Sequence, residues 1–223
     1  MFAKMGLAVF LLVLAAALPT QAQVTVTLIP GGAAFSNSGP SNNVPVTSMS
    51  PYAGTLNGVP EMFYCVDYST PVGAGATWTA HTTLLANSTD YSNTLQYAEN
   101  GGNNSKAMDD YLIMAYLATQ EMQALATGNQ TAAAEDDWAI WSFTSGPDPY
   151  GLNAALVGQA QTAINNGFTV SGWQIITTNP GMTGQEFLLP SPEPSSSVLF
   201  GLGVVLFLFA HSVRKRAHRT TLA

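Results

Sequence analysis

The segment KAMDDYLIMAYLATQEM, residues 106–122, decides the fold class of this chain. Apolar or small residues recur in it at helical spacing, so that one face of a helix can pack on a core. The acids Asp109 and Asp110 are expected in the first turn, where the helix dipole favours negative charge. The predicted core-facing positions are Met108, Leu112, Ala115, Thr119 and Met122.

Two further helices are predicted after this one. Residues 131–143 carry Trp138 and Trp141 one turn apart, which is the spacing of a buried face. The third helix has Asp148 as a capping acid, Pro149 at its first position and Gly167 after its last turn. Its predicted apolar face consists of Leu152, Leu156, Ala160 and Ala163.

Strand signals flank the helices on both sides. Alternating or β-favouring residues predict strands at 23–29, 61–68 and 77–85 upstream, and a hairpin of 168–177 and 185–189 downstream. Pro30-Gly31-Gly32 is expected to end the first strand. Residues 33–58 predict a loop with a short strand near 44–46. Strands, then helices, then strands indicate an α+β domain with an inserted helical part.

The N-terminus has the features of a secretory signal peptide. Lys4 precedes an apolar run from residue 6 to residue 18, and small or polar residues follow up to Ala22. We expect cleavage after Ala22, so that residues 1–22 are removed. A retained N-terminal anchor is the alternative.

The C-terminus predicts a membrane anchor. Residues 195–213 form an uncharged, mainly apolar segment. Its length is close to the ~20 residues that a helix needs to cross a bilayer. The basic tail, residues 214–219, begins with Arg214, Lys215 and Arg216, and such charges keep the adjoining end in the cytoplasm. The bulk of the chain is then expected on the other side of the membrane. A buried core helix is the alternative for the apolar segment.

A short motif precedes this anchor. The order Pro192-Glu193-Pro194, then the apolar segment with Gly201 and Gly203, then Arg214-Lys215-Arg216 resembles a PEP-CTERM sorting signal over residues 190–219. The resemblance implies that an exosortase-like membrane enzyme recognises residues 192–194, cuts nearby and releases or transfers the ectodomain. The two prolines favour an extended, stiff peptide that presents Glu193 outside the bilayer.

The expected ectodomain, residues 23–189, is strongly acidic and long enough to bury a core. Lys106 is its sole Lys or Arg, against twelve Asp and Glu residues, for a net charge of −11 compared with −7 for the whole chain. Because nucleic acid is also negatively charged, we do not expect it to be a partner of this domain. The single cysteine, Cys65, cannot close a disulfide within the chain.

Two segments of this domain resemble the landmark segments of thioester domains, which occur in surface adhesins. They are Phe63-Tyr64-Cys65-Val66-Asp67 and Asp137-Trp138-Ala139-Ile140-Trp141. In that family a cysteine and a glutamine form the thioester, and the bond then couples to amines. Here Asp137 occupies the glutamine position, and a carboxylate is a poor acyl donor. The resemblance therefore implies a thioester-like scaffold at Cys65 and Asp137, without a spontaneous bond.

Other chemistries have weaker signals. Cys65, His81 and an acid together would suit a secreted hydrolase, but a lone cysteine on a strand is typical of a core residue. The run Glu135-Asp136-Asp137 lacks metal-site spacing, so we expect no metal or other cofactor, and we interpret these acids as favouring a helix start and a soluble surface. Trp78 and Trp173 are the more exposed candidates for stacking on sugars, whereas Trp138 and Trp141 are expected to be buried.

The sequence thus predicts an exported, non-enzymatic cell-surface or extracellular-matrix protein. It would be held in the inner membrane by its C-terminus and then processed, with a polysaccharide or another surface ligand as its partner. A covalent thioester-type adhesin that uses Cys65 and a secreted hydrolase are the alternatives.

Overall fold

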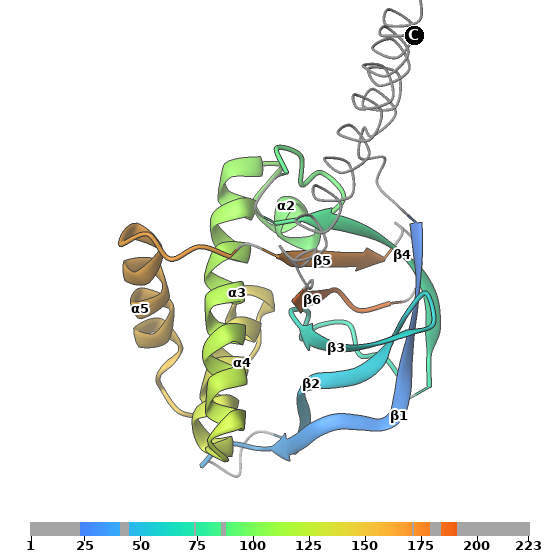
Figure 1. The fold of residues 1–223 in the computed structure, drawn as a ribbon. Coiled ribbons are helices and arrows are strands. Elements are labelled where there is room, and N and C mark those ends of the chain that lie inside the picture. The colour runs from blue at the N-terminus through green and yellow to red at the C-terminus, as the bar shows by residue number, and fades with distance from the viewer. Residues whose placement is uncertain are drawn as a thin grey trace, which may run out of the picture. The chain divides into compact units, whose positions relative to one another are not determined.

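The computed structural model describes residues 23–40, 45–73, 75–85, 88–170, 172–178 and 184–190. Within these ranges it is a mixed structure of helices and strands, as the sequence predicts. Six strands form a closed barrel in the order β1-β2-β3-β6-β5-β4, and four α-helices accompany it (Figure 1). The chain divides into two compact units, one ending at Leu189 and the other starting at Pro190.

The barrel strands come from both ends of the domain. Their bounds are β1 Gln23–Asn37, β2 Thr47–Leu56, β3 Val59–Cys65, β4 Thr77–Leu84, β5 Trp173–Thr178 and β6 Phe187–Pro190. The pairings of β1 with β2 and β4, of β2 with β3, of β3 with β6 and of β4 with β5 are antiparallel. Closure leaves β1 paired on both sides, which protects a strand that would otherwise be an edge.

The helical part is inserted between β4 and β5. Its elements are α2 Leu95–Glu99, α3 Asn104–Ala126, α4 Gln130–Trp141, the 3₁₀ turn η1 Ser142–Thr144 and α5 Asn153–Asn165. Asn103 and Asn129 cap α3 and α4 by accepting the N–H groups of Lys106 and Ala132. The predicted helices at 106–122 and 131–143 are therefore confirmed, whereas α2 was not predicted.

The prediction that 33–58 is a loop is wrong. β1 continues past Pro30-Gly31-Gly32 to Asn37, and β2 begins at Thr47. The pairing of Leu28 with Gly54 is followed directly by that of Ala33 with Tyr52, so residues 29–32 form a large bulge opposite Ala53. Turn-forming residues fit this stretch because a bulge interrupts the ladder and bends the strand locally, while pairing resumes beyond it. Of the short strand predicted near 44–46, residue 44 lies outside the described ranges.

The predicted core face of α3 is confirmed in part: Ala115 is buried and Met108 and Leu112 pack against the core, but the most deeply buried face is offset from the predicted one. Met122 is 40% exposed, and the fully buried positions instead include Tyr111, Met114, Ala118 and Glu121. A helix packed against both the barrel and other helices buries a wide surface, and its most apolar stripe need not be the deepest one. Because α3 begins at Asn104, Asp109 and Asp110 lie beyond its first turn.

The third predicted helix starts later than expected. Asp148 does accept backbone N–H groups, but from Leu152 and Asn153, and α5 begins at Asn153. Gly151, with φ +72°, interrupts a helix that would have started at Pro149. The predicted end is confirmed, since Gly167 follows the last turn with φ +93°. Leu152 is exposed rather than on a buried face.

None of the helices in the described ranges is both long enough and apolar enough to span a membrane. The expected signal peptide (1–22), sorting motif (192–194), anchor (195–213) and basic tail (214–219) all lie outside the described residues.

Candidate functional site

Cys65 and Asp137, the two positions of the thioester-like prediction, are brought together through Ser50. The backbone N–H of Ser50 donates to Asp137 Oδ2 at 2.8 Å, and the Ser50 hydroxyl oxygen accepts the Cys65 N–H at 3.0 Å. All three residues are fully buried. The end of β3, the middle of β2 and the helix α4 therefore meet at one point inside the domain.

The thiol of Cys65 is enclosed rather than presented. Its Sγ donates to the carbonyl oxygen of Asp67 at 3.4 Å, and Trp141 Nε1 donates to the Cys65 carbonyl at 3.0 Å. Burial, reinforced by the negative charge of Asp137, raises the pKa of the Cys65 thiol well above its usual value. Since the thiolate is the nucleophile, this environment suppresses reactivity at neutral pH.

A buried carboxyl pair that sequence reasoning missed lies beside this point. Glu121 on α3 has no exposed surface, and neither of its side-chain oxygens has a hydrogen-bond partner among the described residues. Asp137 Oδ1 also lacks a partner there. Burial and the nearby Asp137 raise the pKa of Glu121, and burial raises that of Asp137. The available signal was position: 121 shares a helical face with 111, 114 and 118.

The interpretation of Asp136 and Asp137 as surface acids is wrong. Asp136 is 6% exposed, and burial, with a contribution from Glu135, raises its pKa to about 7. Both residues lie on α4 well past its first turn, so neither serves the helix start. Among the described residues, no group of three metal-ligating side chains is placed to hold an ion.

Glu186 is another buried acid, and it joins the helices to the barrel. Its carboxylate accepts hydrogen bonds from the Tyr111 hydroxyl, from the Leu95 N–H at 3.0 Å and from the Thr177 hydroxyl at 2.7 Å. Burial raises its pKa to about 7 even though these donors oppose the shift. Unlike Glu121, this carboxylate is well supplied with donors, which indicates a structural role.

His81 lies away from Cys65. It is on β4, where it pairs with Gln23 of β1 and Thr177 of β5, while Cys65 is on β3 and pairs with Phe187 of β6. Along this side of the barrel β5 and β6 separate the two strands. The geometry does not assemble the triad that a cysteine hydrolase would need.

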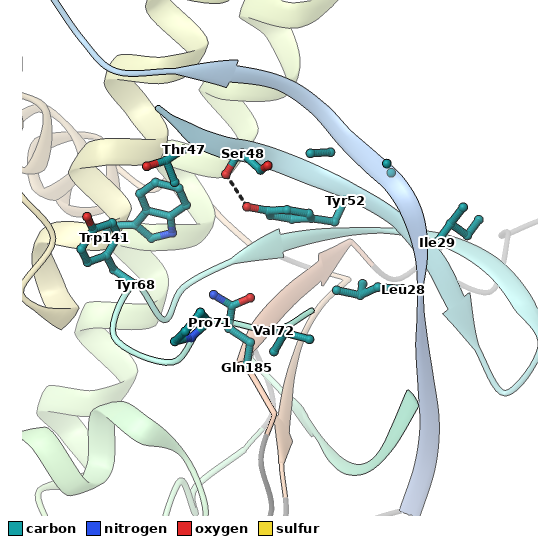
Figure 2. A pocket seen from close by; sticks show the side chains of 13 residues that line it. Leu28, Ile29, Thr47, Ser48, Tyr52, Tyr68, Pro71, Val72, Trp141 and Gln185 are labelled. Atoms are coloured by element: carbon teal, nitrogen blue, oxygen red, sulfur yellow. Dashed lines mark hydrogen bonds between the residues drawn. The ribbon is translucent and has the colours of Figure 1, made fainter. Parts of the chain in front are cut away.

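A cavity of about 240 Å³ opens between the β1 bulge and the loop that follows β3. Figure 2 shows Trp141 and Tyr68 together at one end, Leu28 and Ile29 at the other, and Gln185 with Val72 along one side. Tyr52 extends between these ends and donates its hydroxyl to the Ser48 carbonyl. Residues of the irregular stretch of β1, namely Ile29, Gly31 and Gly32, line the opening.

The prediction for the four tryptophans is right for two of them and wrong for the other two. Trp138 and Trp141 are buried as expected, with ring centroids 5.0 Å apart. Trp78 and Trp173, the expected stacking candidates, are only 7% exposed, so that expectation is wrong. Trp78 stacks on Phe187 and Trp173 packs on Tyr64 inside the barrel. Trp141 is the one of these four that lines the cavity.

Gln185 is the polar side chain that connects the cavity with the surroundings of Cys65. Its Nε2 donates to the Asp67 carbonyl at 2.7 Å, the same oxygen that accepts from Cys65 Sγ. Cys65 pairs with Phe187, the first residue of β6, and Gln185 lies two residues before it in the chain. The sequence offered no signal for this neighbour, because 120 positions separate the two residues.

No protein-family model, no curated protein and no solved structure matches this chain. The functional argument therefore depends on the residues themselves. Pro192, Glu193, Pro194, Arg214, Lys215 and Arg216 lie outside the described residues.

Proposed function

We propose that this chain is an exported cell-surface or extracellular-matrix protein whose barrel domain binds a ligand without catalysing a reaction. The terminal segments carry the first half of the proposal. A signal-peptide pattern at 1–22 and a PEP-CTERM-like tail at 190–219 route the chain across the inner membrane and hold it there for an exosortase-like enzyme.

The cavity carries the second half. An open pocket with aromatic walls and a few polar groups is typical of a binding site. Meanwhile the sole cysteine is buried with a raised thiol pKa and His81 lies on another strand, which favours binding over nucleophilic catalysis. Adhesion to a surface polymer, or assembly into a matrix, is the role that joins these features.

Processing is tested with Glu193→Ala in the native cells. If the motif is recognised, the variant accumulates as full-length protein in the inner membrane, while the wild-type ectodomain is found at the cell surface or in the medium. Glu61→Ala is the matched control, since it also removes one acid but at a position more than 130 residues before the motif in the sequence. Normal release of Glu193→Ala would contradict the sorting proposal.

A covalent adhesin is the second candidate, and the shared acceptor at Asp67 favours it. Both the Cys65 thiol and the Gln185 amide donate to this carbonyl oxygen, at 3.4 and 2.7 Å. Attack of the thiol sulfur on the Gln185 amide carbon would form the S–C bond and break the C–N bond. The amide nitrogen would leave as ammonia with the thiol proton.

Intact mass spectrometry of the protein from native cells decides between the candidates. The binding protein has the mass of its processed chain and one free thiol. A thioester with Gln185 lowers that mass by one ammonia, and a thioester with Asp137 lowers it by one water. In Gln185→Met the ammonia loss would disappear, whereas in Asp137→Asn it would persist.

A further inference from the structure

We infer that the cavity beside Trp141 holds one uncharged pyranose ring of a polysaccharide. The inference rests on the proposed function as a surface-binding domain and names the ligand class for that site. It is carried by the shape of the β1 bulge, by the chemistry of the walls and by the absence of ionisable acids or bases among the residues that line the cavity.

The bulge provides a wall of backbone. No residue from 29 to 32 has a partner in the β1–β2 register, and Pro30 has no N–H group. A Cβ on Gly32 would approach the Ala53 carbonyl oxygen to 2.8 Å, so only glycine fits at this position. At Gly31, φ is +71° and a Cβ would meet nothing within 4 Å, which leaves the wall open toward solvent.

The aromatic side chains suit the apolar face of a sugar ring. Tyr68 and Trp141 pack with ring centroids 5.4 Å apart at one end of the cavity, while Tyr52 extends along it (Figure 2). Trp141 is only 1% exposed and lies behind Tyr68, so the half-buried rings of Tyr68 and Tyr52 are the surfaces that a ligand can reach. A pyranose presents C–H groups on its faces and hydroxyls around its rim. Aromatic surfaces can cover those faces while polar groups at the wall meet the rim.

Polar groups that match sugar hydroxyls are present at the opposite walls. The Thr47 hydroxyl donates to the Pro45 carbonyl at 3.0 Å, which leaves its oxygen able to accept. Gln185 uses one N–H on Asp67, and a carboxamide has a second N–H and a carbonyl oxygen to offer. Ser48 adds a hydroxyl beside Thr47.

The charge distribution selects a neutral ligand. Among the described residues, those that line the cavity include no Asp, Glu, Lys, Arg or His. An anionic sugar would enter the field of a domain with net charge −11, without a basic side chain to compensate. A cationic sugar would lose hydration in a cavity that offers no carboxylate in return. A neutral ring meets neither cost.

The volume sets the size of the ligand. Pockets for drug-sized molecules measure roughly 300–1,000 Å³. At about 240 Å³ this cavity is smaller, which fits one ring with its substituents reaching the opening. Longer oligosaccharides should therefore bind about as tightly as the single glycoside.

The test is calorimetric titration of the full chain in a zwitterionic, sugar-free detergent. The probes are the methyl glycosides of glucose, galactose, mannose and N-acetylglucosamine, with galacturonate and glucosamine as charged counterparts. We expect saturable binding of at least one neutral glycoside and none of the charged ones. Binding of no neutral glycoside, or preferential binding of a charged one, would overturn the inference.

Two variants locate the site. Val72→Trp fills the cavity and should weaken binding by at least about tenfold. Val59→Trp adds the same bulk at an exposed position of β3 (57% exposed) and should leave binding unchanged. If Val72→Trp does not fold, Gln185→Met decides, since it removes only the amide. If Val72→Trp folds and binds with wild-type affinity, the ligand lies elsewhere and the inference is overturned. The same holds for wild-type affinity of Gln185→Met when Val72→Trp does not fold. The sugar-binding experiment does not measure sorting. Its failure would therefore overturn the ligand class without affecting the sorting proposal, which the Glu193→Ala experiment tests separately.

Discussion

The backbone N–H of Ser50 donates to Oδ2 of Asp137 at 2.8 Å across 87 positions of sequence. This contact fastens the helical insertion to the barrel, since Ser50 is on β2 and Asp137 is on α4. It also fixes the orientation of an acid whose other oxygen has no partner among the described residues. Asp137, which the thioester-like prediction singled out, is thus a buried structural carboxyl.

Asp137→Asn is expected to stabilise the domain at alkaline pH. Burial raises the pKa of this carboxyl, so its ionisation in the folded state is unfavourable, and the neutral amide keeps an oxygen for the Ser50 N–H. We expect a gain of about 1–3 kcal/mol in the free energy of unfolding at pH 8.5, and little change at pH 4. Denaturant unfolding at the two pH values measures both effects.

The control for this variant is Asp109→Asn, which removes an equal charge from an exposed position of α3. If Asp137→Asn lost stability at pH 8.5 while Asp109→Asn did not, the ionised carboxylate would be the stabilising form and the argument would fail.

Glu121→Met is expected to stabilise the domain as well. Both carboxyl oxygens of Glu121 are buried without a partner among the described residues, and an apolar side chain of similar length removes that cost. We expect a gain of about 1–4 kcal/mol at pH 8.5. Gln123→Met, two residues along and exposed, should change stability by less than about 0.5 kcal/mol.

Glu121 and Asp137 should also be energetically coupled. Since each raises the cost of ionising the cluster, removing either one relieves part of the repulsion. In a double-mutant cycle at pH 8.5, the double variant Glu121→Met/Asp137→Asn should gain less free energy of unfolding than the sum of the gains of the two single variants. Strict additivity would mean that the two carboxyls titrate independently.

The domain should be more stable in mild acid than in mild base. Burial raises the folded-state pKa of Asp136 and Glu186 to about 7, above their unfolded values of 3.8 and 4.5. The folded state therefore binds more protons between those values. The contribution of these groups to the free energy of unfolding is fully present below about pH 4, falls as pH rises towards 7 and then stays constant. For each group the total loss is about 1.4 kcal/mol per unit of difference between its folded and unfolded pKa.

Thermal unfolding from pH 4 to pH 9 measures this profile. A midpoint that rises between pH 4.5 and pH 7 would show that these carboxyls are ionised in the folded state and would refute the prediction. Asp90, whose pKa is lowered by hydrogen bonds to Ser92, is exposed and acts in the opposite direction.

Cys65 should be protected from thiol reagents in the folded protein. Its side chain is fully buried and its pKa is raised, so both access and thiolate population are low. We expect maleimide labelling to be slow in buffer and complete in guanidinium chloride, as followed by mass. In Ser105→Cys, an exposed thiol at the start of α3 should add one fast label under native conditions.

Equally fast labelling of Cys65 and of the added thiol would contradict the burial of Cys65. A Cys65 that stays unlabelled even after denaturation would instead point to a covalent bond at its sulfur.

The sequence by itself determined the order of strands, helices and strands, the positions of α3 and α4, and the burial of Trp138 and Trp141, because each follows from local periodicity. The starts of the two helices depend on the caps Asn103 and Asn129, which the periodicity did not indicate. It also carries the proposed routing, because signal peptides and sorting tails are recognised as linear segments.

Only the tertiary structure decided that β1 passes through a bulge at residues 29–32, that Glu121 is buried beside Asp137, and that Gln185 shares an acceptor with Cys65. These features depend on partners 16 to 120 positions away, which local patterns do not encode. Pairing with β2 on both sides of the bulge holds a stretch whose own residues favour turns. Packing of α3 and α4 in the folded domain buries acids that would otherwise be solvated.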